Sequence, residues 1–184
     1  MRILFTFAAL LISTPAFATA WVVDSKASYI TFTWVESGKK SSGHIADIAA
    51  TIDFDPKAPE KGSIDATIPL DGLLTDEDER RDELLSAEWF DFASFPQARY
   101  VSKTIKADGK GGFIAEGSLT LKGVTAPVTV SFTLSEEDGM THASGKATVT
   151  RTDFKVGSGD FANDDTYVAF PVEVKISVAA RPKA

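Results

Sequence analysis

Apolar and polar residues alternate with a period of two along most of the chain beyond residue 20. Ile30, Phe32 and Trp34 show the pattern first, with threonines between them. Such alternation is typical of β-strands that bury one face. We expect strands at about 29–34, 45–54, 63–70, 99–106, 113–121, 128–134, 141–150 and 166–178, separated by Gly, Pro and Asp turns. No strand–helix–strand alternation is visible, so the pattern predicts an all-β domain of roughly eight antiparallel strands, as a closed barrel or a sandwich.

The segment 76–89 breaks the strand pattern. Thr75 or Asp76 can cap the start of a helix, and the acidic residues that follow are favourable at its positive N-terminal end. Leu84, Leu85 and Trp89 supply an apolar stripe. We therefore predict one short amphipathic helix at about 76–89, inserted into the β-domain.

The first twenty residues have the organisation of a secretory signal peptide. Arg2 gives a positive start, an apolar stretch follows, and small-x-small triplets at 16–18 and 18–20 offer two cleavage points. We expect cleavage of residues 1–20 before Trp21, which leaves 21–184 as one exported domain. The apolar stretch is shorter than the roughly 20 residues that span a bilayer, and no later stretch is long enough. The mature chain is therefore not expected to be an integral membrane protein.

Composition narrows the function classes. The 184-residue chain has no cysteine and a net charge of −7. The lack of cysteine excludes thiol redox chemistry and thiolate metal sites, and the negative charge disfavours a nucleic-acid partner. The two histidines, His44 and His142, belong to no zinc-binding sequence pattern, and no nucleophile-elbow sequence is present. We predict no catalytic residue, no metal and no enzyme activity, although a Ser-His-Asp arrangement formed only in space stays open.

Three ordered segments resemble the YceI family. The first runs through 76–102, the second, 117–129, reads Gly-Ser-Leu-Thr-Leu-Lys-Gly-Val-Thr-Ala-Pro-Val-Thr, and the third is Arg-Thr-Asp-Phe at 151–154. In the first segment the family's pattern is filled by Arg81, Asp82, Leu84, Phe90, Asp91 and Pro96. The chain departs from the family's pattern at 43–45 and at Ala50, where a glycine is expected.

This resemblance implies a lipocalin-like antiparallel β-barrel secreted into the periplasm. It also implies a tubular apolar interior that holds a polyisoprenoid, such as a quinone tail or a polyprenyl phosphate, and no other cofactor. The function that follows is a periplasmic lipid-binding or carrier protein. A homodimer is left open as the assembly state.

The apolar faces of the predicted strands carry both large and small residues. Packing of large against small would fill a small barrel, whereas small residues that line a tunnel would leave room for one ligand. The residues alone leave both readings open, and the resemblance favours the tunnel. We predict that the ligand contacts Ile30, Phe32, Trp34, Ile48, Ile64, Val130, Phe132 and Phe170. The alternative is a filled barrel that binds an envelope or stress-response partner and has no lipid ligand.

Arg81, Asp82, Arg151 and Asp153 are the charged residues of the resembling motifs. We predict a structural role, in which charge-assisted hydrogen bonds hold the helix and the last hairpin against the barrel. The alternative is that one of the arginines contacts a phosphate or quinone head group.

Overall fold

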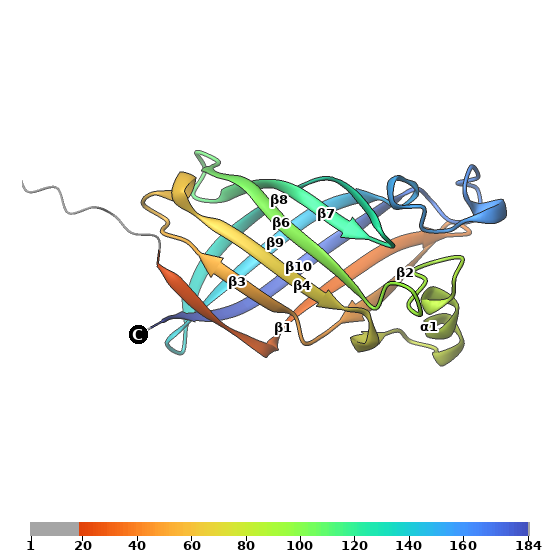
Figure 1. Cartoon of the computed structure of the whole chain (residues 1–184), viewed down its shortest axis with the longest axis horizontal. Helices are drawn as coiled ribbons and strands as arrows, with labels where there is room; N and C mark the ends of the chain where they lie inside the picture. Colours follow the sequence, from red (N-terminus) through yellow and green to blue (C-terminus); the bar gives the residue numbers. More distant parts are fainter. Residues whose placement is uncertain (1–18, 184) are drawn as a thin grey trace, which may run out of the picture.

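The computed structural model describes residues 19–183, in which ten antiparallel strands form one closed sheet (Figure 1). The strands are β1 Ala20–Glu36, β2 Lys39–Ile45, β3 Ala49–Asp53, β4 Ser63–Pro69, β5 Leu73–Leu74, β6 Gln97–Ala107, β7 Phe113–Leu121, β8 Val124–Glu137, β9 Met140–Thr150 and β10 Pro171–Pro182. One α-helix, α1 Asp78–Leu85, and four 3-10 turns, η1 Pro59–Lys61, η2 Leu70–Gly72, η3 Arg151–Phe154 and η4 Gly159–Phe161, interrupt them.

Closure comes from β1, which pairs with β10 on one side and with β2 and β3 on the other. β2 and β3 lie end to end in one position of the barrel, and β4 and β5 share another, because β3 pairs with β4 and β2 with β5. The ten strands therefore occupy eight positions, which confirms the predicted eight-stranded antiparallel barrel and excludes the sandwich.

The strand predicted at 45–54 is wrong at its start, because the chain breaks between β2 and β3. Asp47 adopts a left-handed conformation with a φ of +59°, which aspartate tolerates better than most residues. The break shifts the inside–outside alternation by one residue. Ile45 and Ile48 are consequently both buried, at 5% and 2% exposure, although strict alternation would place them on opposite faces.

The predicted helix at 76–89 is too long. α1 ends at Leu85, because Ser86 takes an extended conformation with a ψ of 165°, and Trp89 lies in the turn that follows. Glu77 is the N-cap, without a side-chain capping bond, so neither Thr75 nor Asp76 caps the helix. Leu84 and Trp89 are both buried, but they reach the core from the helix and from the turn separately.

The last strand begins five residues later than predicted, at Pro171 instead of 166, and continues to Pro182. The residues before it are held by other elements: Ala169 N–H donates to the Val35 carbonyl at 2.9 Å, and the Phe170 carbonyl accepts from Arg151 N–H at 2.9 Å. An isolated antiparallel bridge also joins Val168 to Glu36, so the segment still contacts β1 but does not continue the regular ladder between β1 and β10.

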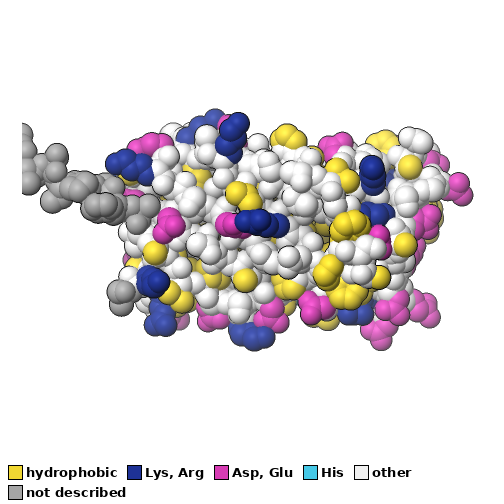
Figure 2. All heavy atoms as spheres, viewed as in Figure 1, with side chains coloured by type: hydrophobic (Ala, Val, Ile, Leu, Met, Phe, Trp, Pro, Cys, Tyr) yellow, Lys and Arg dark blue, Asp and Glu magenta, His cyan; other side chains and the backbone are white. Residues whose placement is uncertain are grey.

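The two ends of the barrel differ (Figure 1). α1, η3 and η4 gather at one end, while β1 begins and β10 finishes at the other. Figure 2 shows basic and acidic side chains spread along the barrel, with acidic ones prominent at the α1 end. The predicted signal peptide lies outside the described residues except for its last two, and Ala20 already belongs to β1. Within 19–183 no helix has the length and apolarity needed to cross a bilayer.

Candidate ligand cavity

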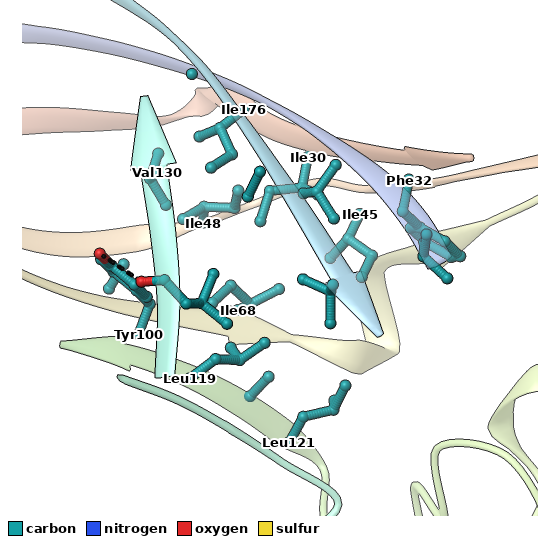
Figure 3. A pocket seen from close by; sticks show the side chains of 18 of the residues that line it. Ile30, Phe32, Ile45, Ile48, Ile68, Tyr100, Leu119, Leu121, Val130 and Ile176 are labelled. Atoms are coloured by element: carbon teal, nitrogen blue, oxygen red, sulfur yellow. Dashed lines mark hydrogen bonds between the residues drawn. The ribbon is translucent and has the colours of Figure 1, made fainter. Parts of the chain in front are cut away.

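The barrel encloses a cavity of about 290 Å³, which is close to the small end of the range seen for ligand pockets. Side chains from both ends and from every position of the wall line it, and nearly all of them are apolar. Seven of the eight residues predicted to contact a ligand line this cavity: Ile30, Phe32, Trp34, Ile48, Ile64, Val130 and Phe132. Figure 3 shows Ile30 of β1, Val130 of β8 and Ile48 of the connection between β2 and β3 projecting into the same space.

Phe170 is the exception, because it does not line the cavity. It precedes β10 and is half-buried, with the guanidinium carbon of Arg151 lying 5.2 Å from its ring centroid. The predicted role of Phe170 in the lining is therefore wrong. The error follows from extending the period-two pattern of β10 into a segment that is not a strand.

Tyr100 places a hydroxyl in the apolar middle of the cavity, a feature that the sequence did not reveal. The hydroxyl donates to the Ala115 carbonyl at 3.0 Å, which leaves it satisfied without a ligand (Figure 3). Gly117 makes room for the ring, because a Cβ at this position would lie 2.7 Å from Tyr100 and 2.4 Å from the Val101 carbonyl oxygen. Burial, with a smaller effect of the Glu116 charge, raises the pKa of Tyr100 to about 12, so the phenol is neutral.

Three phenylalanines pack together toward the end of the barrel opposite α1. The Phe54 ring lies 5.0 Å from that of Phe113 and 5.7 Å from that of Phe132, and the last two are 5.3 Å apart. Phe54 and Phe132 line the cavity, whereas Phe113 packs behind them. This end of the cavity is therefore aromatic and offers no charged group.

The charged lining residues all lie at the α1 end: Glu36, Arg80, Glu83 and Arg151. Arg80 donates to the Glu36 carboxylate, and both side chains are about a fifth exposed, at 23% and 22%. The Arg80 guanidinium also lies over the Trp34 ring, 5.9 Å from its centroid. Burial raises the pKa of Glu36, but hydrogen bonds from Arg80 and Tyr167 outweigh it, and the net pKa is lowered. The pair is therefore ionised at neutral pH.

Arg81, one of the two arginines singled out from the sequence, is not in the cavity lining. Its Nε donates to the Leu73 carbonyl at 2.8 Å and its Nη2 to the Asp71 carbonyl at 3.4 Å. Asp82 lies 3.5 Å from the Arg81 guanidinium and is 78% exposed. Arg81 therefore ties α1 to β5 and η2, while its neighbour Arg80 reaches the cavity.

Arg151 is 3% exposed and is surrounded by main-chain oxygens. Its five N–H groups donate to the carbonyls of Ala169, Val156, Gly157, Asp164 and Val168. Burial lowers the pKa of Arg151, partly offset by the charges of Asp164 and Asp165. Asp153 is exposed, and within 19–183 no ion pair or side-chain hydrogen bond joins it to Arg151. Arg151 therefore fixes the 156–169 segment over the end of the barrel.

The arrangement offers a long apolar space with polar groups at one end. Such a space can remove an apolar chain from water, and the α1 end can meet a more polar head. Across residues 19–183 no group of three or more histidine, aspartate or glutamate side chains is placed to hold a metal ion. The His44 ring packs against the Tyr29 ring in a tilted arrangement with 4.9 Å between the ring centroids, and neither residue lines the cavity.

Comparisons with known proteins agree with this architecture. The YceI-like domain family matches residues 21–180. Protein YceI of Salmonella agona is 36% identical over 130 residues, which cover 68% of each chain. Burkholderia cenocepacia BcnA superposes with a TM-score of 0.80 at 27% identity, over 86% of this chain and 99% of that one. A polyisoprenoid binding domain from Saccharophagus degradans has the same fold at 14% identity and a TM-score of 0.67, over 90% and 99% of the two chains. The chain belongs to the YceI family.

Proposed function

We propose that this protein is a periplasmic carrier that holds a polyisoprenoid, a quinone or a polyprenyl phosphate, inside its barrel and does not catalyse a reaction. The observation that carries the proposal is the cavity of about 290 Å³ with its almost wholly apolar lining. Each methylene group removed from water contributes about 0.8 kcal/mol, so an isoprenoid chain can bind by burial alone. The periplasmic location rests on the signal peptide predicted at residues 1–20.

Family membership supports the ligand class. The Saccharophagus degradans domain that shares this fold is a polyisoprenoid binding domain, and it aligns over 90% of the chain. The cavity of this protein meets the physical requirement for the same ligand, because it runs between an aromatic apolar end and a polar end. A chain with one polar terminus would match that polarity.

The filled barrel is the competing account. A filled barrel would close the interior by packing large residues against small ones. The cavity counts against it, because the interior stays open where small residues such as Ala66 and Ala147 line the wall.

Blocking the interior tests the proposal. Val130 lines the cavity, whereas its neighbour Thr129 is exposed on the outside of β8. Val130→Phe should therefore fill space that the ligand needs, and Thr129→Phe adds the same ring outside the cavity. Trp21, Trp34 and Trp89 all line the cavity, so quenching of tryptophan fluorescence by an added prenylated quinone reports binding directly.

We expect Val130→Phe to weaken quinone binding at least tenfold and Thr129→Phe to leave it unchanged. Equal binding by wild type and both variants would place the ligand outside the barrel. No quenching of the wild-type protein would contradict the proposal.

A further inference from the structure

Two buried hydrogen-bond donors at the α1 end of the cavity have no partner. Within residues 19–183, Arg80 Nε and Trp89 Nε1 are the buried side-chain nitrogens that make no hydrogen bond. The Asp76 carboxylate lies 3.5 Å from Arg80 Nε, but this contact does not meet hydrogen-bond geometry, and Asp76 is 72% exposed. Buried unpaired N–H groups are rare in folded proteins. Both residues line the cavity, so a ligand that accepts hydrogen bonds would supply the missing partners.

Among the described residues that line this end of the cavity, no cation is free to meet an anion. Arg80 already neutralises Glu36, and Glu83 adds a negative charge to the lining. Arg151 is the other lining cation, but its five N–H groups are occupied by main-chain carbonyls. Acidic side chains also crowd the surface around α1 (Figure 2). The four charged lining residues sum to zero and the acidic side chains around α1 make the surroundings negative, so a phosphate entering here would lose water without meeting an unpaired cation.

We propose that Glu36 is a specificity-determining residue that makes the cavity select an isoprenoid with an uncharged, hydrogen-bond-accepting head, such as a hydroxyl or a quinone carbonyl, over a phosphorylated one. The inference rests on the proposed function. Glu36 acts by holding Arg80 in an ion pair, which cancels the cation that a phosphate would need. The uncharged oxygen is left to accept from the unpaired N–H groups of Arg80 and Trp89.

The test compares probes that share one tail. Farnesol, a farnesylated benzoquinone and farnesyl phosphate differ only in the head, and calorimetry measures the affinity of each for the whole mature protein. The key variant is Glu36→Gln, which keeps the shape and a carbonyl acceptor for Arg80 but removes the charge. Asp65→Asn is the matched control, because Asp65 also pairs with an arginine, Arg99, but on the outside of the barrel.

We expect wild type to bind farnesol and the quinone at least tenfold more tightly than farnesyl phosphate. Glu36→Gln should raise the affinity for farnesyl phosphate about tenfold or more, because a charge-assisted bond to Arg80 becomes available, with little change for farnesol. Asp65→Asn should leave all affinities unchanged. Added salt should strengthen the binding of farnesyl phosphate to wild type, because it screens the repulsion.

The outcomes separate the two claims. Wild type that binds farnesyl phosphate as tightly as farnesol would overturn the role of Glu36 and leave the carrier function standing. Failure of every farnesyl probe to bind wild type would overturn both. The ratio of the wild-type affinities for farnesol and farnesyl phosphate can still overturn the proposal if Glu36→Gln does not fold.

Discussion

The ring of Phe32 packs directly over the backbone of Gly43 on the neighbouring strand, so that a Cβ at residue 43 would lie 2.3 Å from the Phe32 Cζ. The ring cannot withdraw freely, because it also packs on Trp34 at 5.6 Å and on Phe90 at 6.0 Å. Gly43 is therefore required by the packing at the α1 end of the cavity.

Gly43→Ala should consequently destabilise the fold. The added methyl group forces Phe32 from its position, a form of overpacking that costs about 1–3 kcal/mol of unfolding free energy. Chemical denaturation measures the loss. Ser42→Ala, at the exposed neighbouring position, is the control and should change the stability by less than about 0.5 kcal/mol. Unchanged stability of Gly43→Ala would show that Phe32 has room to move.

Arg151 should be needed for its geometry as well as its charge. Arg151→Lys keeps the positive charge but cannot satisfy the five carbonyls that the guanidinium reaches, so we expect a loss of more than about 3 kcal/mol in unfolding free energy. Arg99→Lys alters an exposed ion pair and should cost less than about 1 kcal/mol. Equal and small losses of unfolding free energy in the two variants would mean that water replaces the guanidinium as the hydrogen-bond donor to these carbonyls.

Tyr100 should make the fold sensitive to alkali. Its pKa is raised from an ordinary value of 10.0 to about 12 by burial first and by the Glu116 charge second. The folded state therefore holds the phenol proton more tightly than the unfolded state. This contribution to stability is fully present below pH 10 and is lost as the pH rises toward 12. Tyr100→Phe should lose less unfolding free energy than wild type between pH 10 and pH 12. Chemical denaturation at a series of pH values measures this difference. Parallel losses in wild type and variant would contradict the assignment.

The residues just before Trp21 should add stability. The Thr19 carbonyl accepts from Phe54 N–H at 2.9 Å, and the Ala20 carbonyl accepts from Lys183 N–H at 2.8 Å. A chain that starts at Trp21 lacks both bonds and should unfold more easily than one that starts at Thr19, by about 1–3 kcal/mol. Thermal denaturation of the two purified chains compares them. Identical melting temperatures would show that these pairs are frayed in solution.

The barrel could be predicted because each strand carries its own evidence in the local alternation of residues. The exceptions lie where a single residue leaves the regular backbone. The left-handed Asp47 divides one predicted strand, and the extended Ser86 ends the helix before Trp89. Phe170 is left out of β10 because the pairing of residues 168–170 with β1 is irregular and shifted from the register of the strand. None of these three departures can be recognised from the period-two alternation of apolar and polar residues.

The polar end of the cavity was harder to foresee. Glu36 continues the inward series of Ile30, Phe32 and Trp34, so its position could have been read from the same alternation. Its partner could not, because Arg80 and Arg81 are adjacent on one helix and only the packing of α1 decides which one turns inward. The family motif drew attention to Arg81 instead.

Native mass spectrometry of the protein purified from the cells that naturally produce it tests the central claim most directly. The account predicts a fraction of the protein carrying one isoprenoid molecule, released by organic solvent and identified by its mass. It also predicts that the emptied protein takes up an added prenylated quinone and that Val130→Phe does not. Protein that is empty as isolated and takes up no isoprenoid would contradict the account.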